Sequence, residues 1–596
     1  MWSGASSSIS KMVNLASAVA RENRAISFVA RTNIAVHVIE RENNTFIYSM
    51  QGKHCRPCHS SIKIRQSSSI ISSSLSIMQR IRGGGNNNNC DVNSRNISSS
   101  AAGHHSNNNN GATAWHKAYI AVGSNLGDRY QNIALALSLL AATGSIRIIR
   151  TSHLRTTAPM YVTDQPPFLN GAVEISTRLS PWELIRTLKD VERKLGRDVS
   201  PTSNAVRFGP RTIDLDILLY DTLIMKEVST TDDEHGTTME LEIPHPRISE
   251  REFVLSPMCD LEGSRNKNAI THPVYNKTMS CMLKTLLHDN NQSCINDKEE
   301  DRAIRLLPLP RGRMILFNET IIMGILNVTP DSFSDGGKYI HSVDTSASEA
   351  IQMVIDGAGI IDVGGESTRP GADDITSDEE LRRVIPVITR IRELGCDVPI
   401  SVDTRRAIVA RAAVEAGADI VNDVSGGTYD PDMFSTVAAL GVPIILMHMR
   451  DNPKTMQSHV NYDDVGGVVD GVAKELLCRS VNAEAAGIPR WLQIIDPGIG
   501  FAKDLKGNLS LIRNIDTLRR SCDNLPILFG PSRKGFIGKI TGVTNPEDRD
   551  YGTIAACLAS IQYGGDYNYD VCNILRVHNV KAMKQATMVY DAIRNA

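Results

Sequence analysis

The stretch Ile321-Ile-Met-Gly-Ile-Leu-Asn-Val328 is the first of eight short runs, rich in β-branched residues, that recur through the C-terminal half of the chain. The other seven runs span residues 360–364, 399–403, 419–423, 443–448, 492–496, 526–530 and 574–578. The sequence between the runs has helical apolar spacing, and near-continuous apolar strands are typical of parallel sheets buried on both faces. Eight such units predict a (β/α)8 TIM barrel over residues 313–596, with its chemistry at the C-terminal ends of the strands.

A polar residue that a packed core would not choose closes or follows each run. These residues are Asn327, Asp362, Asp403, Asn422, His448, Asp496, Lys534, and Arg576 with His578. Loop capping would explain one of them, but eight in phase predict a polar mouth on one face of the barrel. Asp403, Asn422 and Asp496 can pair with the edge of an amino-pyrimidinone ring. The opposite pole, suited to a diphosphate with its Mg²⁺, would consist of Asn327, Arg369, Arg576 and His578.

Residues 115–285 have a different pattern. Strands are expected at 117–123, 146–156, 169–178 and 213–220, and a helix at 128–142. Ser180-Pro-Trp-Glu183 is a capping box with proline at the first helical position, so a second helix begins there. The order βαββαβ predicts a ferredoxin-like α+β domain, in which two helices cover one face of an antiparallel sheet. The polar residues 286–312 are expected to be a linker between the two domains.

Asp214 and Asp216 lie two residues apart on the last expected strand, so both project from one face. A carboxylate pair facing a cleft can hold Mg²⁺, which fills its other positions with water and phosphate oxygens. On an exposed strand such a pair is more often only solvated, but arginines that could hold a polyphosphate surround this one. They are Arg197, Arg207, Arg211, Arg247 and Arg251. Residues 221–241 are expected to form an inserted acidic loop.

The first domain resembles 6-hydroxymethyl-7,8-dihydropterin pyrophosphokinase. The resemblance rests on Tyr119-Ile-Ala-Val-Gly-Ser-Asn125, Gln165-Pro-Pro-Phe-Leu-Asn170, Gly209-Pro-Arg-Thr-Ile-Asp-Leu-Asp216 and Ile243-Pro-His245. It implies transfer of pyrophosphate from ATP to the hydroxymethyl group of the pterin, with two Mg²⁺ ions held by Asp214 and Asp216. It also implies a pterin slot made of Phe168, Asn170 and Phe253. The resemblance gives catalytic roles to Arg197, Arg211 and the two aspartates, and ATP or phosphate binding to Arg197, Arg207, His245 and Arg251.

The second domain resembles dihydropteroate synthase. The matching segments are residues 324–337, Asp362-Val-Gly-Gly-Glu-Ser-Thr-Arg-Pro-Gly371, Asp496-Pro-Gly-Ile-Gly-Phe501 and Ser532-Arg-Lys-Gly535. The resemblance implies condensation of a pterin diphosphate with p-aminobenzoate, which yields 7,8-dihydropteroate and pyrophosphate. The implied pterin-binding residues are Asp403, Asn422, Asp496 and Lys534, of which Lys534 is also catalytic. The implied p-aminobenzoate site is Thr368, Pro370, Phe501 and Lys534, and the implied diphosphate site is Asn327, Thr368, Arg369, Arg576 and His578, with one Mg²⁺ on Asn327.

The product of the first implied reaction is the substrate of the second, which indicates a bifunctional folate-synthesis enzyme similar to those of plants. Its partners would be the small molecules hydroxymethyldihydropterin, ATP and p-aminobenzoate, and the barrel would mediate a homo-oligomer. One alternative is the methyl-tetrahydrofolate-binding barrel of corrinoid methyltransferases, but the sequence has no Asp-x-His-x-x-Gly signature. The other is a catalytically silent pterin-binding module, which the presence of both Asp214/Asp216 and Arg576/His578 opposes.

Composition limits the remaining classes. The 596 residues carry a net charge of −2, and they include no run of about 18 uncharged apolar residues, so neither a nucleic-acid nor a membrane partner is expected. Residues 1–110 hold twelve Lys or Arg but four Asp or Glu, and we expect residues 1–114 to be a disordered, low-complexity basic extension. Its first 39 residues have the profile of a transit peptide, which with the plant resemblance implies the mitochondrial matrix, the alternative being an untargeted cytosolic protein. Cys55 and Cys58 have ligand-like spacing, but no second pair follows, so a tolerated tail sequence is the preferred interpretation.

Overall fold

The chain separates into two compact units, residues 1–98 and 99–596, which are described one at a time. A computed structural model describes residues 25–29, 35–41, 45–51, 114–160, 162–197, 209–230, 238–262, 269–293, 303–328, 339–366, 374–451, 455–562 and 573–594.

Three short strands are described in the first unit. β1 (Ala25–Val29), β2 (Ala35–Arg41) and β3 (Thr45–Gln51) form an antiparallel sheet in that order. They lie within residues 1–114, where we expect a disordered extension, and the rest of residues 1–113 lies outside the described part of the chain. Each segment is locally rich in β-branched or aromatic residues, which favours strands even inside a Ser- and Asn-rich region. Cys55 and Cys58 lie outside the described residues.

The second unit opens with an antiparallel sheet. Its strands are β4 (His116–Ser124), β5 (Ile146–Thr151), β6 (Leu154–Thr157), β7 (Phe168–Thr177) and β8 (Asp214–Tyr220). β4 lies between β7 and β8, and β5 and β6 pair with successive stretches of β7. The single strand expected at 146–156 is therefore two strands, which Ser152 and His153 separate. The ferredoxin-like arrangement is confirmed.

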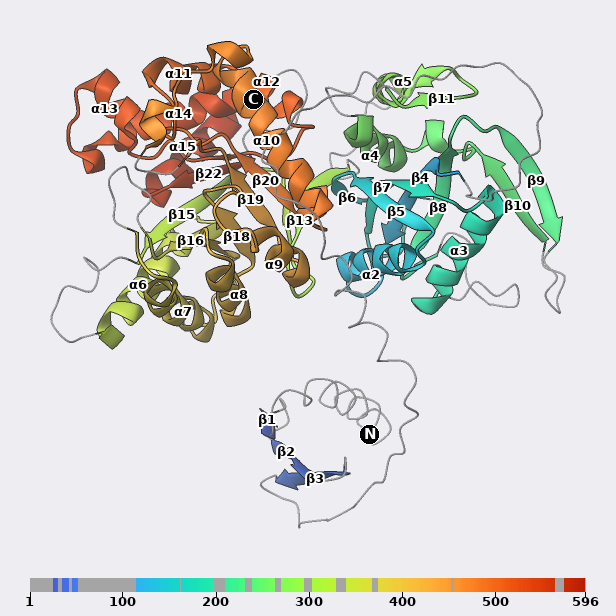
Figure 1. Ribbon diagram of the computed structural model, residues 1–596, viewed down its shortest axis with the longest axis horizontal. Helices are drawn as coiled ribbons and strands as arrows, with labels where there is room; N and C mark the ends of the chain where they lie inside the picture. Colours follow the sequence, from blue (N-terminus) through green and yellow to red (C-terminus); the bar gives the residue numbers. More distant parts are fainter. Residues whose placement is uncertain are drawn as a thin grey trace. The chain divides into compact units, whose positions relative to one another are not determined.

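Helices cover both faces of this sheet (Figure 1). α2 (Arg129–Ala142) and α3 (Pro181–Lys194) cover one face, where Ile133 and Leu188 pack with Ile120. The predicted capping box begins α3, because Ser180 N–H donates to the Glu183 carboxylate at 2.8 Å and Glu183 N–H donates back to Ser180 Oγ at 3.4 Å. α4 (Glu252–Glu262) and α5 (Met279–Ser293) cover the other face, which the βαββαβ pattern did not predict.

Two segments expected to be irregular contain regular structure. Within residues 221–241, β9 (Met225–Thr230) pairs with β10 (Thr238–Ile243), so the inserted loop is a β-hairpin. A second small hairpin pairs β11 (Thr271–His272) with β12 (Lys277–Thr278). Within the expected linker 286–312, α5 continues to Ser293, and β13 (Ile304–Pro308) begins a hairpin completed by β14 (Met314–Leu316). The expectation of a linker over all of 286–312 is therefore wrong.

The β13–β14 hairpin contacts both domains of the second unit. On one side, β13 pairs with β6 and extends the first-domain sheet to the order β14-β13-β6-β7-β4-β8. On the other side, its apolar side chains Leu307, Leu309 and Ile315 are buried with Met323, Ile360 and other residues from the starts of the barrel strands. The hairpin is thus an edge of the sheet and also the floor of the barrel.

Leu307 at this floor should matter for the stability of the whole second unit. Replacing it by Ala leaves a cavity among buried side chains, so we expect a loss of about 2 to 5 kcal/mol of unfolding free energy. Urea unfolding followed by circular dichroism measures it, with Leu509→Ala as the control because Leu509 is 43% exposed on α11 (Leu505–Arg513). Equal urea midpoints for the two variants would contradict the role given to the hairpin.

Eight parallel strands form the expected barrel. They are β15 (Ile321–Asn327), β16 (Ile360–Gly364), β17 (Ile400–Asp403), β18 (Ile420–Asp423), β19 (Ile444–Met447), β20 (Gln493–Asp496), β21 (Leu528–Phe529) and β22 (Ile574–Val577). The sheet order is β20-β19-β18-β17-β16-β15-β22-β21, and a bridge between Ile495 and Ile527 joins its two ends. The strand centres are apolar and buried, which confirms the barrel predicted from the eight runs.

Helices separate the strands along the chain and cover the barrel (Figure 1). They are α6 (Tyr339–Ile355), α7 (Ser377–Glu393), α8 (Ala407–Ala416), α9 (Met433–Leu440), α10 (Val468–Ala485), α11, α12 (Ile515–Ser521), α13 (Gly535–Thr541), α14 (Asp550–Gln562) and α15 (Val580–Arg594). In the part of the chain that the structure describes, no helix has the length and apolar character needed to span a bilayer.

Two candidate active sites

One pocket in the first domain gathers most of the residues predicted there. We call it the first-domain pocket, and eight predicted residues line it: Phe168, Asn170, Arg211, Asp214, Asp216, His245, Arg251 and Phe253. They come from β7, β8, the segment before β8, the turn after β10 and the start of α4. Arg197 reaches the same place through Asp214, whereas Arg207 lies outside the described residues.

Asp214 and Asp216 project from the same face of β8, as their spacing predicts. Arg197 Nη1 lies 2.5 Å from Asp214 Oδ1, and Arg211 Nη1 lies 2.9 Å from Asp214 Oδ2. Burial alone would raise the pKa of Asp214, but the two guanidinium groups outweigh burial and hold this pKa below its usual value. Asp214 is therefore a carboxylate at neutral pH, and with Asp216 it offers oxygen ligands of the kind that Mg²⁺ prefers.

Lys189 and Glu192 on α3, which no sequence pattern singled out, lie behind this pair. Lys189 Nζ lies 2.9 Å from Glu192 Oε1 and 3.5 Å from Asp216 Oδ1, and Glu192 Oε1 also lies 2.8 Å from Arg197 Nη1. Glu192 further accepts a hydrogen bond from Leu215 N–H at 2.7 Å, so it attaches α3 to the strand that carries both aspartates. Their three-residue spacing on a helix was the available signal, but it does not show that the helix packs against β8.

The sides of the pocket are held by Asn125, the last residue of the first resemblance motif. Its amide nitrogen donates to Gln165 Oε1 and to Pro166 O, both at 3.1 Å, and its Oδ1 accepts from Arg211 N–H at 2.7 Å. Asn125 therefore joins the segment before Phe168 to the segment that carries Arg211. The aromatic and amide side chains of the expected pterin slot are brought together in this way.

His245 and Arg251 present donors to the pocket. Burial is the main reason that the pKa of His245 is lowered, so its ring is neutral at pH 7. His245 Nδ1 accepts from Arg247 N–H at 3.2 Å, which places the ring proton on Nε2. Arg251 stacks over the Phe253 ring at 5.4 Å, and its Nε is buried with no hydrogen-bond partner among the described residues. A donor left unsatisfied in a pocket favours an acceptor ligand, such as a phosphate.

A second pocket lies at the C-terminal ends of the barrel strands. We call it the barrel pocket, and five of the residues predicted there line it: Asn422, Asp496, Phe501, Lys534 and Arg576. Arg576 Nε donates to Asp362 Oδ2 and its Nη2 donates to Asp403 Oδ2, both at 2.6 Å, so the predicted Asp403 contacts a residue that lines the pocket. Asn422 Nδ2 also donates to Asp362 at 3.2 Å. Asp362, which had no role in the sequence-based assignment beyond its strand end, thus organises two of the site residues.

Burial sets the charge balance of the barrel pocket. Burial raises the pKa of Asp403 to about 7, with Arg576 opposing that effect and Asp362 adding to it. Burial also raises the pKa of Asp496, whose Oδ1 accepts from Gly498 N–H at 2.7 Å. Lys534 Nζ lies 4.0 Å from the centre of the Phe501 ring, a cation–π contact between two residues expected to border p-aminobenzoate.

Other predicted residues of the barrel lie elsewhere or are not described. Asn327 ends β15 and is exposed, and His578, which follows β22, contacts Ser532 Oγ through Nδ1 at 2.9 Å; neither lines the barrel pocket. Thr368, Arg369 and Pro370 fall in residues 367–373, outside the described part of the chain.

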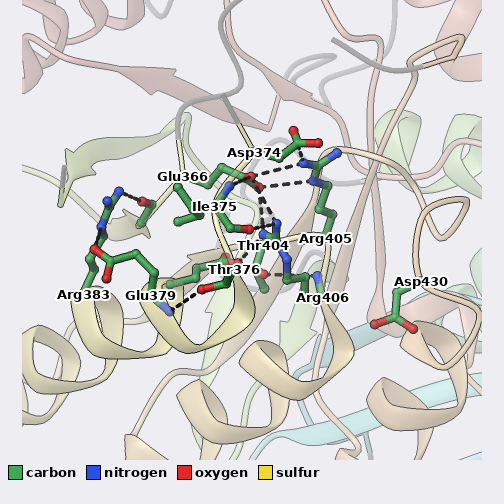
Figure 2. Close-up of polar contacts among 12 residues, drawn as sticks. Glu366, Asp374, Ile375, Thr376, Glu379, Arg383, Thr404, Arg405, Arg406 and Asp430 are labelled. Atoms are coloured by element: carbon green, nitrogen blue, oxygen red, sulfur yellow. Dashed lines mark hydrogen bonds and ion pairs between the residues drawn. The ribbon is translucent and has the colours of Figure 1, made fainter. Parts of the chain in front are cut away.

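An ionic network built on the buried side chains of Glu366, Arg405 and Arg406 holds the described residues on either side of that segment (Figure 2). Glu366 accepts from Arg405 Nε at 3.1 Å and from Arg406 Nη1 at 2.9 Å. Arg405 also reaches Asp374 at 2.9 Å, and Arg406 donates to Ile375 O at 2.6 Å. Two arginines that follow β17 thus fix both Glu366 and Asp374–Ile375, a contact that no local sequence pattern predicts.

Comparison with known proteins agrees with both family resemblances. The family model for 7,8-dihydro-6-hydroxymethylpterin-pyrophosphokinase matches residues 119–263, and the model for pterin binding enzymes matches residues 323–578. The chain is 42% identical over 499 residues to the mitochondrial folate synthesis bifunctional protein of Arabidopsis thaliana, covering 80% of this chain and 83% of that protein. It is 41% identical over 493 residues to the mitochondrial folate synthesis bifunctional protein of Pisum sativum, covering 80% and 88%.

The barrel alone also matches a separate synthase. Residues of this chain are 46% identical over 289 positions to the dihydropteroate synthase of Synechocystis, covering 48% of this chain and 95% of that protein. This relative supports the synthase over the corrinoid methyltransferase alternative. The chain belongs to the family of bifunctional folate synthesis proteins, transferases that join a hydroxymethyldihydropterin pyrophosphokinase to a dihydropteroate synthase.

Proposed function

We propose that the first-domain pocket binds hydroxymethyldihydropterin beside ATP. Phe168 and Phe253 supply faces for the heterocycle, and Asn170 supplies an amide for its edge. Arg197, Arg207, His245 and Arg251 bind the triphosphate, and Asp214 and Asp216 hold two Mg²⁺ ions. The observation that carries this proposal is the convergence of the two carboxylates, the unsatisfied Arg251 Nε and the two aromatic rings in one pocket.

These residues would act by positioning the two substrates and by stabilising negative charge on the phosphates. When bound, Mg²⁺ neutralises charge on the phosphate oxygens. His245 Nε2–H and the Arg251 guanidinium donate to phosphate oxygens. Arg197 and Arg211 stabilise the negative charge that develops on the phosphates as the pterin hydroxyl displaces AMP. The pairing of both arginines with Asp214 keeps them at the reacting end of the pocket.

We propose that the barrel pocket binds the pterin diphosphate and p-aminobenzoate. Asp403, Asn422, Asp496 and Lys534 bind the pterin, while Thr368, Pro370, Phe501 and Lys534 border p-aminobenzoate. The diphosphate is bound by Asn327, Thr368, Arg369, Arg576 and His578. Loss of diphosphate from the pterin methylene leaves a ring-stabilised cation, so the site must bind the anion tightly and exclude water until the amine attacks.

A single Mg²⁺ at the synthase site would use Asn327. Among the described residues no group of three or more His, Cys, Asp or Glu could hold a metal by itself. Asn327 ends β15 at an exposed position, and its single amide oxygen would suit an ion that keeps most of its waters and takes further oxygens from a diphosphate.

The whole reaction can be tested with the full chain. We expect 7,8-dihydropteroate to form from hydroxymethyldihydropterin, ATP, Mg²⁺ and p-aminobenzoate, and to be lost when any one is omitted. Chelation with EDTA should stop the first step. A chain that binds pterin but gives no product would support the silent module instead.

We propose that the N-terminal extension is a targeting signal for the mitochondrial matrix. Two of the relatives above are named mitochondrial, and the basic composition of the first 39 residues agrees with that location. Deleting residues 1–110 should leave the rates of pyrophosphoryl transfer and of the synthase step within about twofold of those of the full chain. The shortened protein should stay in the cytosol. Fluorescent fusions of the full and shortened chains, with assays of the purified proteins, test this; loss of pterin turnover in the shortened protein would oppose it.

We also propose that the barrel mediates a homo-oligomer. Exposed apolar side chains gather on its last helices, with Met588, Val589 and Ile593 on α15 and Tyr551 on α14. A monomer mass by light scattering at micromolar concentration would count against this.

A further inference from the structure

Lys503 is a buried lysine to which neither proposed reaction gives a role. Lys503 lies in the loop after β20 and is only 3% exposed. Its ammonium nitrogen donates to Phe501 O at 2.7 Å and lies 3.0 Å from His448 Nδ1. Taking a lysine out of water costs free energy that its partners must offset, so a site that keeps one requires an explanation.

Behind Lys503, the side chains of His448, Glu475 and Arg450 form a chain of polar contacts that ends at the lysine nitrogen. His448 Nε2 lies 2.9 Å from Glu475 Oε2, and Arg450 binds Glu475 Oε1 through Nε at 2.9 Å and Nη2 at 2.7 Å. Burial, assisted by Lys503, lowers the pKa of His448 to about 3, so the ring is neutral. A neutral ring with its proton on Nε2 donates to Glu475 and accepts from Lys503 through Nδ1, which satisfies all three side chains.

The groups in front of Lys503 belong to the barrel pocket. Phe501, whose carbonyl Lys503 holds, presents its ring to Lys534 Nζ at 4.0 Å. The neighbouring Ala502 O accepts from Tyr462 Oη at 3.1 Å, so this piece of backbone is fixed at two consecutive carbonyls. The same turn carries Asp496, and an added Cβ at Gly498 would lie 2.0 Å from His448 O and 3.5 Å from Lys503 Nζ. The turn is therefore closely packed against both residues.

We propose that Lys503 is a positioning residue of the synthase site. Its buried side-chain nitrogen, hydrogen-bonded to Phe501 O and to His448, fixes the 496–501 turn and thereby sets the places of Asp496 and of the Phe501–Lys534 pair. The inference rests on the proposed function, because those three residues are among the ones assigned there to the pterin and p-aminobenzoate. Lys503 itself does not line the barrel pocket, so it acts through the turn and not on substrate.

The thermal stability of a Lys503 variant distinguishes a positioning role in the synthase site from a role in stabilising the fold. Burial is the main reason that the pKa of Lys503 is lowered to about 7; Asp496 and Glu475 oppose this, and Arg479 and Arg450 add to it. A folded-state pKa below the unfolded value means that the unfolded chain binds the extra proton between about pH 7 and the usual lysine pKa. The folded state is therefore disfavoured as pH falls through this range, and Lys503→Met, which cannot be protonated, should melt no lower than the parent at pH 7.

The test uses the full chain with Lys503→Met, Lys503→Gln and, as a matched control, Lys506→Met, because Lys506 is exposed on the nearby α11. We expect Lys503→Met to lower kcat/KM of the synthase step roughly 10- to 100-fold, mainly through higher KM values for both substrates. Lys503→Gln, which keeps a donor for Phe501 O, should recover part of the loss. Lys506→Met and the kinase step of every variant should match the parent.

Three outcomes would overturn the proposal. The first is a parental synthase rate in Lys503→Met, and the second is a loss of rate matched by a fall in its melting temperature. The third, relevant if Lys503→Met does not fold, is a folded Lys503→Gln with parental KM values. A parent chain that makes no dihydropteroate would be a failure of the proposed function and not of this inference.

Discussion

Asp216→Asn should lower the rate of pyrophosphoryl transfer by roughly 100- to 1000-fold, because a lost anionic ligand removes several kcal/mol of charge stabilisation from the metal-bound phosphates. Asp216 lines the first-domain pocket, and its carboxylate lies 3.5 Å from Lys189 Nζ, so the amide keeps the shape of the site and removes the charge. The barrel shares no lining residue with this pocket. Condensation of supplied pterin diphosphate with p-aminobenzoate should therefore proceed at the parental rate.

Asp190→Asn is the matched control for this variant. Asp190 is an exposed acid on α3 that pairs with Arg193 and does not line the first-domain pocket. Both half-reactions of the control should be normal. Raising the Mg²⁺ concentration should partly restore Asp216→Asn but not change the control, and equal Mg²⁺ dependence in the two proteins would contradict the metal-ligand role.

Arg576→Ala should have the reverse effect, lowering the synthase step by roughly 30- to 1000-fold while leaving pyrophosphoryl transfer intact. Two losses combine at this position. The diphosphate loses a fixed cation, and Asp362 and Asp403, which Arg576 holds at 2.6 Å, become buried carboxylates without that partner. The loss should therefore appear in the KM for pterin diphosphate as well as in kcat.

The pH dependence of Arg576→Ala gives a further check. Arg576 opposes the rise that burial causes in the pKa of Asp403, so its removal should shift this pKa further upward. The acid limb of the synthase rate should then move to higher pH, while the control Arg513→Ala, on the exposed side of α11, should keep the parental profile. An unshifted acid limb in Arg576→Ala would contradict the coupling between these two residues.

The sequence predicts the parts of this molecule that local patterns specify. Eight apolar runs are enough for the barrel, because every strand is buried on both sides and ends in phase at one face. Asp214 and Asp216 share a face through their spacing alone, and Ser180 and Glu183 specify the start of α3 through capping chemistry. These features depend on residues that are neighbours in the chain.

What the sequence did not predict depends on packing between distant segments. The β13–β14 hairpin lies in a stretch rich in charged residues, and its strands form because β6 offers an edge and the barrel floor offers an apolar surface. Asn125, Glu192 and Lys503 are single residues whose roles follow from their burial beside partners far along the chain. No periodicity marks such residues, since their partners lie in segments that only the fold brings together.

The β13–β14 hairpin links the stability of the two domains, although their two pockets are separate. The two pockets have no lining residue in common, yet Leu307 and Ile315 are buried in the barrel floor while β13 continues the first-domain sheet. Stability is therefore expected to be shared, whereas chemistry is not. Variants of the full chain are for this reason better tests of the two activities than chains cut in residues 286–312.

The most direct test of two independent sites is to mix purified Asp216→Asn and Arg576→Ala. Each variant alone should fail to make dihydropteroate from hydroxymethyldihydropterin, ATP and p-aminobenzoate. The mixture should succeed, because Arg576→Ala releases pterin diphosphate that Asp216→Asn then consumes. If the mixture makes no dihydropteroate although each surviving half-reaction is normal, the sites do not exchange a free intermediate and the account of two independent sites is wrong.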